Sequence, residues 1–134
     1  MIAVDTNALV RVLVEDDKEQ AQAVRKTINF AEKNSIQILI LSEVLLETVW
    51  VLESVYGSSR DEIFKFLETL IYTPTFTLSD YESIRRAVHQ YKKEGDFADL
   101  LIVNKAIEQQ AKKLFGFDKG LQTKFPDFVV EKIA

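Results

Sequence analysis

With 134 residues, 47% of them hydrophobic and 28% charged, the chain has the size and composition of one globular domain. It contains no cysteine, which excludes thiolate chemistry, and its one histidine, His89, lies among basic residues typical of a solvated helix face. A Ser-His-Asp triad is therefore nearly excluded. The net charge of −4 argues against bulk binding to nucleic acid, although a local basic strip remains open. The chain shows neither an apolar run long enough to cross a membrane nor a signal peptide, so we expect a cytoplasmic protein.

The first half of the chain alternates apolar runs with amphipathic segments. A short buried strand is predicted at 2–5, then a short helix within 7–17 and a longer one over about 18–33. A near-continuous β-branched and leucine run predicts a strand at 36–41. Ser42 can cap a helix over roughly 43–56, which Gly57 closes.

The second half continues the alternation. Ser59 and Glu62 form a capping box for a helix reaching about residue 72, and residues 75–78 are a candidate strand. Ser79 and Glu82 form a second capping box for a helix that runs to about residue 94. We expect a helix over 97–111, strands at 113–117 and 128–133, and a loop between these strands. The pattern predicts a single α/β domain with a central, mainly parallel sheet of four to five strands and helices on both faces. Ligands would bind beyond the carboxyl ends of the strands.

Five acids occupy suggestive positions. Asp5 directly follows the first strand, although it could simply cap the helix that comes next, and Asp118 follows the strand at 113–117. Glu47 is a carboxylate in an otherwise apolar stretch of helix, which is costly to bury without a partner; it could also reach solvent along a groove. Asp96 and Asp99 begin an apolar helix, where capping is again the simpler explanation.

Such acids have a shared chemical use if the fold brings them together. Strands that end in acids at one edge of a parallel sheet would place carboxylates close to one another, where they repel unless a cation neutralises them. Oxygen ligands without histidine or cysteine favour Mg²⁺ or Mn²⁺ over Zn²⁺. A site of this kind suits hydrolysis of a phosphodiester.

These residues resemble the motifs of PIN-domain proteins, and of VapC-type ribonuclease toxins among them. The resemblance covers almost the whole chain and rests on VDTNALVR at the start, ExxWVL from Glu47, DFADLLI from Asp96, and FDK at 117–119. It implies a three-layer α/β/α fold and an endoribonuclease that depends on Mg²⁺ or Mn²⁺. The implied catalytic acids are Asp5, Glu47, Asp99 and Asp118, which would also bind metal together with Asp96.

The resemblance extends to surrounding residues. Thr6 and Asn7 would support the acids by hydrogen bonds. Arg11, Lys105 and Lys119 are candidate RNA contacts, with Lys92 and Lys93 farther out, although each alone is more readily explained as a solvated surface residue. Gly116 departs from the Thr or Ser that many relatives carry two positions before the last acid, so a hydroxyl contact to metal or phosphate would be missing.

Partners follow from the same resemblance. It implies an RNA substrate, a small antitoxin that folds into a groove of the toxin, and a homodimer. The apolar helix at 43–56 and its neighbours could supply such surfaces through Trp50, Tyr56, Phe64 and Phe66, with core packing as the alternative.

Two other classes of protein fit the sequence less well. A haloacid-dehalogenase-type phosphatase needs a second Asp where this chain has Asn7, and a response-regulator receiver needs an acid that ends a middle strand, for which only Asp80 is available. The stronger rival is a PIN-fold module that binds RNA or protein without cleaving it.

Overall fold

The computed structural model describes residues 1–133. Its elements alternate along the chain almost as the apolar pattern predicts. In chain order they are β1 (Ile2–Ala3), α1 (Thr6–Leu13), α2 (Lys18–Lys33), β2 (Ile38–Ile40), α3 (Ser42–Ser54), α4 (Arg60–Tyr72), β3 (Phe76–Leu78), α5 (Tyr81–Tyr91), α6 (Phe97–Glu108), β4 (Leu114–Phe115), α7 (Lys119–Lys124) and β5 (Val129–Val130). The domain is α/β, and every strand pairing is parallel, as predicted.

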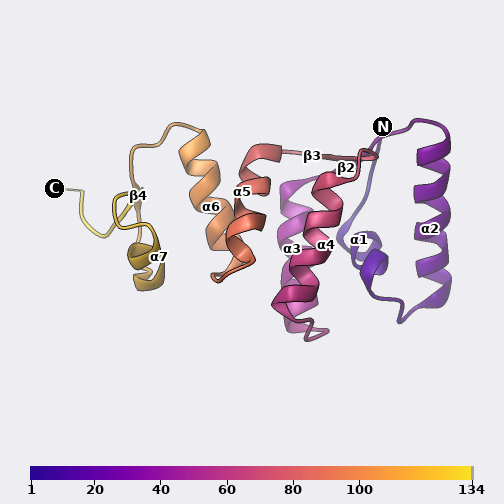
Figure 1. Ribbon diagram of the computed structural model, residues 1–134, viewed down its shortest axis with the longest axis horizontal. Coiled ribbons are helices and arrows are strands. Elements are labelled where there is room, and N and C mark those ends of the chain that lie inside the picture. Colours follow the sequence, from indigo (N-terminus) through magenta and orange to yellow (C-terminus); the bar gives the residue numbers. More distant parts are fainter. Residues whose placement is uncertain (134) are drawn as a thin grey trace.

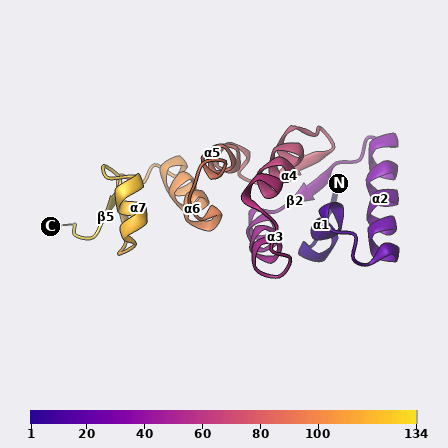
Figure 2. The same ribbon diagram turned by 60° about the horizontal axis from the view of Figure 1, so that its bottom comes forward.

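The five strands are divided between two sheets. The first has the order β1-β2-β3, and the second pairs β4 with β5. Figures 1 and 2 show an elongated molecule in which the second sheet and α7 lie at one end, beyond α5 and α6. The strand β1 lies at the far side of α3 and α4 from that end. The expected single sheet is therefore present as a pair of smaller ones.

The hydrophobic core lies mainly between the helices. Leu45 of α3, Leu67 of α4, Val88 of α5 and Leu101 of α6 are all fully or almost fully buried, and they belong to one cluster that also reaches Ile40 of β2. The helices α1 and α2 pack on each other and α1 also packs on α3. Burial of this apolar surface is the main favourable contribution to folding.

The two faces of the three-stranded sheet differ in burial. Ile38 and Ile40 share one face, because side chains alternate along a strand, and both are completely buried. On the opposite face Leu39 and Thr77 are only half-buried, and Ala3 is exposed. Parallel sheets are normally covered on both faces, so this sheet has one unusually open side.

Several predicted boundaries differ from the structure. All five strands are shorter than predicted, and the stretch predicted as a loop after β4 contains α7, whose first turn Asp118 caps. The capping box predicted at Ser59 and Glu62 is confirmed, whereas the one predicted at Ser79 is wrong. The Ser79 hydroxyl instead accepts a hydrogen bond from the Ser42 backbone N–H at 2.8 Å, which ties the end of β3 to the start of α3.

Among residues 1–133, no helix combines the length and apolar character needed to cross a bilayer. The predicted exposure of His89 is confirmed, and its ring lies 3.0 Å from the Tyr72 hydroxyl. Of the aromatic residues considered as partner surfaces, Phe64 and Phe66 are buried in the core, while the Trp50 side chain is 61% exposed.

Candidate functional site

The acids predicted to form a site fall into two groups, each lining its own pocket. The first group contains Asp5 and Glu47, which line an open pocket of about 460 Å³ with Thr6 and Asn7. Asp5 follows β1, and its carboxylate caps α1 by accepting a hydrogen bond from the Ala8 N–H at 2.9 Å. Capping and ligand binding are compatible here, because a carboxylate has further lone pairs to offer.

Glu47 reaches this pocket from the middle of α3. Its side chain is exposed, although the residues around it in the sequence are apolar. Glu47 thus reaches solvent, which was the alternative to a buried carboxylate. The Thr6 hydroxyl donates a hydrogen bond to the Glu47 carboxylate and so holds the first turn of α1 against α3. The supporting role that the resemblance implies for Thr6 stays a prediction, with which this contact is compatible.

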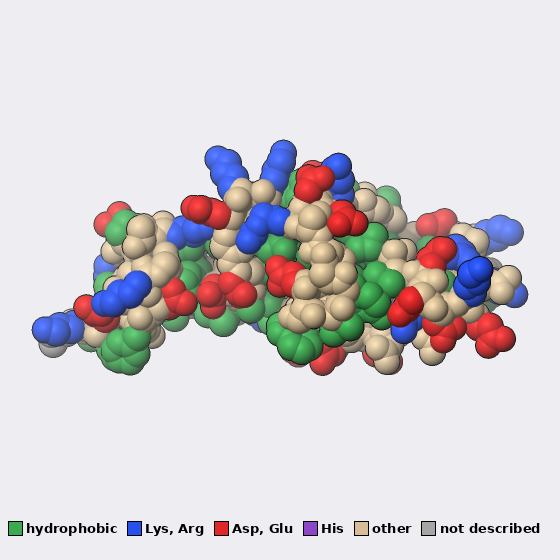
Figure 3. Space-filling model, turned by 90° about the horizontal axis from the view of Figure 1, so that it is seen from below, with side chains coloured by type: hydrophobic (Ala, Val, Ile, Leu, Met, Phe, Trp, Pro, Cys, Tyr) green, Lys and Arg blue, Asp and Glu red, His purple; other side chains and the backbone are tan. Residues whose placement is uncertain are grey.

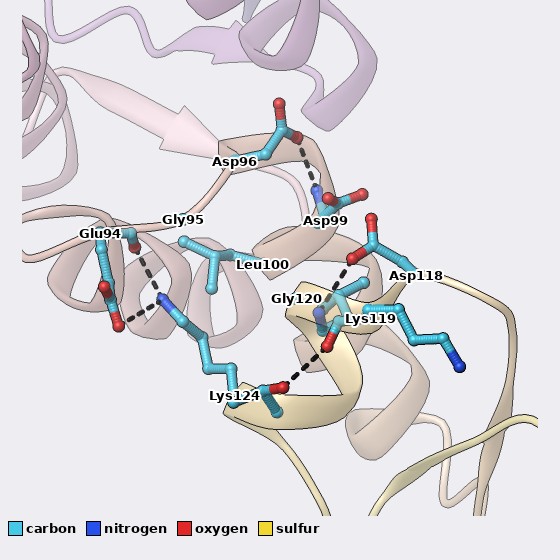
Figure 4. Close-up of a pocket in the computed structure, with 11 residues that line it drawn as sticks. Glu94, Gly95, Asp96, Asp99, Leu100, Asp118, Lys119, Gly120 and Lys124 are labelled. Carbon is cyan, nitrogen blue, oxygen red and sulfur yellow. Dashed lines mark hydrogen bonds and ion pairs between the residues drawn. The ribbon is translucent and has the colours of Figure 1, made fainter.

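The second group contains Asp96, Asp99 and Asp118, which line an open pocket of about 620 Å³ between α6 and α7. Asp96 is the N-cap of α6 and accepts a hydrogen bond from the Asp99 N–H at 3.0 Å. Asp118 is the N-cap of α7 and accepts one from the Leu121 N–H at 2.9 Å. Figure 4 shows the carboxylates of Asp99 and Asp118 side by side at one end of this pocket.

The electrostatics of the second pocket disfavour negative charge on Asp99. Partial burial raises the pKa of Asp99, and the neighbouring carboxylates Asp96 and Asp118 raise it further. The helix N-terminus opposes this effect by favouring an anion. The raised pKa means that burial and the two carboxylates together outweigh the helix N-terminus, and a bound cation would favour the ionised form of Asp99.

The two pockets are separate. They share no lining residue, and Asp5 follows a strand of the three-stranded sheet whereas Asp118 follows a strand of the other sheet. Within residues 1–133, no three Asp, Glu or His side chains lie close enough to hold a metal ion together. The carboxylate oxygens are the type of ligand that Mg²⁺ and Mn²⁺ prefer. In each pocket, however, fewer than three of these carboxylates lie close enough to bind the same ion.

The basic residues proposed as RNA contacts are engaged with acids to different degrees. Arg11 pairs with Asp16 at 3.0 Å and bonds the Tyr56 hydroxyl, and its side chain is only 15% exposed. Lys105 pairs with Asp80 at 3.1 Å. Lys119 pairs with Glu131 at 2.7 Å but is 76% exposed.

Lys124 is a pocket residue that had not been predicted from the sequence. Lys124, at the end of α7, lines the second pocket and donates a hydrogen bond to the Glu94 carbonyl at 3.0 Å (Figure 4). Its position depends on α7, which was predicted as loop, and the only sequence signal is that Asp118 is a good N-cap followed six residues later by a lysine.

Comparison with known proteins identifies the family of the chain. A "VapC ribonuclease" of Aquifex aeolicus (strain VF5) is 26% identical over 120 residues, which cover 89% of this chain and 88% of the relative. No solved structure matches the chain significantly. The model of the PIN domain family matches residues 2–125, nearly the whole of the chain. On the extent of that match, and with the α/β fold and the acids described above, the chain belongs to the PIN domain family.

Proposed function

We propose that this protein is an endoribonuclease that hydrolyses RNA phosphodiester bonds, and that it is the toxin of a VapBC-type toxin–antitoxin pair. The observation that carries the proposal is the second pocket, in which Asp96, Asp99 and Asp118 converge from two different helices. Membership of the PIN domain family and similarity to a VapC ribonuclease support the same assignment.

The proposed cofactor is Mg²⁺ or Mn²⁺. Such an ion supplies an activated water and neutralises charge on the phosphate. Asp5, Glu47, Asp99 and Asp118 are the proposed catalytic acids, and Asp96 is a proposed additional ligand. No three described acids lie within reach of a common ion, so within one described chain at most two of them would hold it and waters would complete its ligand set.

Phosphate binding beside so many acids needs cations that can leave their present partners. Lys119 suits this role best, because its ion pair with Glu131 is solvent-exposed and such pairs contribute little stability. Arg11 is less suited, since Asp16 and Tyr56 hold its largely buried guanidinium. Lys105, Lys92 and Lys93 are the remaining proposed contacts.

The proposed partners are a small antitoxin and a second copy of the chain. Trp50 and Val55 on and just after α3 are 61% and 63% exposed, so they are the residues of that region free to contact a partner. A cytoplasmic location remains a prediction.

The test is cleavage of structured and unstructured RNAs with Mg²⁺, with Mn²⁺ and with EDTA, using the wild type and Asp99→Asn. The matched control is Asp61→Asn, since Asp61 also lies in the first turn of a helix but is exposed and remote in α4. We expect cleavage with either metal, loss of at least about 100-fold in Asp99→Asn, and unchanged activity in Asp61→Asn.

Two outcomes would contradict the proposal in different ways. Cleavage that survives EDTA or Asp99→Asn would refute the metal-dependent nuclease. RNA binding that metal strengthens, without any cleavage, would support the alternative of a non-cleaving PIN-fold RNA- or protein-binding module.

A further inference from the structure

Each of the two sheets ends in strands that pair on one side only, β1 and β3 in the first sheet and β4 and β5 in the second. The backbone of β1 bonds only to β2, through Ile2 N–H to Gln37 and Val4 N–H to Leu39, and β4 bonds only to β5. Within residues 1–133, no strand covers the outer edge of either β1 or β4. An uncovered edge presents unpaired N–H and C=O groups and readily adds another strand.

Exposed apolar side chains accompany both edges. Beside β1, Met1, Ile2 and Leu41 are 72%, 38% and 39% exposed. At the opposite end, Ile102 of α6, Phe115 of β4 and Phe117 are 51%, 54% and 69% exposed. Figure 3 shows hydrophobic side chains at the surface of that end, on the left of the view. The two apolar surfaces lie on opposite sides of α3 and α4, and each would be covered if it packed on the other surface of a second copy (Figure 1).

The surface area indicates how much of the molecule remains to be covered. The accessible surface is 8139 Å², whereas a folded monomer of 15.4 kDa is expected to expose about 7200 Å². The excess of roughly 900 Å² is comparable to the area that each partner buries in a protein–protein interface of standard size, about 800 Å². A second copy of the chain could therefore cover it.

The chain cannot readily join these edges by itself. The strand β4 lies at one end of the molecule and β1 on the far side of α3 and α4 (Figures 1 and 2). Only residues 109–113 connect α6 to β4, and five residues span at most about 18 Å. Moving β4 farther would require α6 to leave the core, where Leu100, Leu101 and Val103 are buried.

We propose that two copies of this chain exchange their C-terminal units, defined as residues 114–130 (β4, α7 and β5). In this dimer β4 of each copy pairs in parallel with β1 of the other copy. Two five-stranded sheets form in this way, and each contains strands from both chains. Two-fold symmetry pairs the open edges of β1 and β4 in both copies at once, so the exchange closes on two copies, with β3 and β5 as the edges of each sheet.

The exchange has a consequence for the acids, which rests on the proposed function. Asp5 follows β1 and Asp118 follows β4, and parallel neighbours present their carboxyl ends at the same edge. The dimer would therefore bring Asp118 and Asp99 of one copy beside Asp5 and Glu47 of the other. Each active site would be composite, which explains why the acids of a single chain form two incomplete groups.

Cysteine pairing tests the exchange without any need for activity, because the chain has no cysteine of its own. One preparation carries Ala3→Cys and another carries Phe115→Cys; the two are mixed, refolded together and mildly oxidised. Leu114→Cys and Gly116→Cys each replace Phe115→Cys in parallel experiments, because the residue of β4 that lies opposite Ala3 depends on the register of the pairing. The control replaces Ala3→Cys by Phe30→Cys, since Phe30 is 59% exposed on α2, away from the β1 edge. We expect a mixed disulfide dimer with Ala3→Cys and none with Phe30→Cys.

Two measurements would overturn the exchange. One is a monomeric mass for the wild type by light scattering at micromolar concentration. The other is a disulfide within one chain, as a monomer band, when Ala3→Cys and Phe115→Cys are combined in the same chain. Circular dichroism of each variant verifies that it folds.

Complementation separates this inference from the proposed function. Asp5→Asn and Asp118→Asn should each fold, because Asn caps a helix as well as Asp does. If they are refolded together, half of the dimers contain both variants and each of these has one intact site, so we expect about a quarter of wild-type cleavage. Cross-linking without any wild-type cleavage would refute the nuclease alone. Wild-type cleavage without complementation or cross-linking would refute the exchange alone.

Discussion

Replacing Arg60 should loosen the segment that carries the second pocket. One guanidinium nitrogen of Arg60 donates hydrogen bonds to the carbonyls of Tyr91, at 3.0 Å, and Gly95, at 2.8 Å. The guanidinium carbon also lies 4.4 Å from the centroid of the Tyr91 ring. These contacts join the start of α4 to the end of α5 and to the residue immediately before Asp96. Arg60→Ala removes all of them at once.

The size of the effect follows from the contacts. Each hydrogen bond contributes about 1 kcal/mol net, and a cation over an aromatic ring at an exposed site adds about 0.5 kcal/mol. Because the Arg60 side chain is partly solvated, we expect Arg60→Ala to lower the free energy of unfolding by about 2 kcal/mol. For a chain of 134 residues this corresponds to a fall in Tm of about 7 °C.

Thermal unfolding followed by circular dichroism measures this change. Arg60→Lys keeps a cation near the ring but loses the planar fork, so we expect roughly half of the shift. The matched surface control is Lys65→Ala, which breaks an exposed ion pair with Asp61 on the same helix and should shift Tm by less than about 2 °C. If Arg60→Ala proves no more destabilising than Lys65→Ala, the contacts to Tyr91 and Gly95 do not hold these elements together.

Three further predictions concern the residues around the pockets. Because partial burial and the carboxylates of Asp96 and Asp118 raise the pKa of Asp99, its ionisation opposes folding above the pKa of an unfolded Asp, and fully so above the raised pKa. In EDTA, Asp99→Asn should therefore raise Tm at neutral pH, and a Tm-versus-pH series should show this gain shrinking as the pH falls from the raised pKa and absent below the pKa of an unfolded Asp. Gly95→Ala should lower Tm, since Gly95 has φ +102° and an added Cβ would come within 2.9 Å of Lys124 Nζ, and an unchanged melting curve would contradict this. Gly116→Ser should leave Tm within about 2 °C of the wild type, because an added Cβ meets nothing within 4 Å, and calorimetry decides it.

The local elements could largely be predicted from the sequence, because their signals are local. The helix α2 begins after the N-cap Asp17 and α4 after the capping box of Ser59 and Glu62, and short-range hydrogen bonds of this kind do not depend on the rest of the fold. Where a polar side chain finds a distant partner, the local signal fails. Ser79 is the example, since its hydroxyl serves the backbone of Ser42 rather than its own helix.

The candidate site could be predicted in its residues but not in its arrangement. The acids Asp5, Glu47, Asp96, Asp99 and Asp118 were predicted from residue type and position, and the structure places each of them in a pocket. Their division into two groups could not be predicted, because it depends on whether β4 pairs with β1 or only with β5. Lys124 was missed for a related reason, since it enters its pocket only through α7.

The sequence by itself thus determined the order of helices and strands, the parallel α/β class, and a set of carboxylates without histidine or cysteine beside them. Periodicity, capping residues and donor chemistry are properties of short segments and can be read without a fold. Only the tertiary structure decided which strand edges remain open, which acids share a pocket, and that Phe64 and Phe66 pack in the core while Trp50 does not. These outcomes depend on contacts between residues distant in sequence, where alternative pairings of similar strands compete and no local pattern distinguishes them.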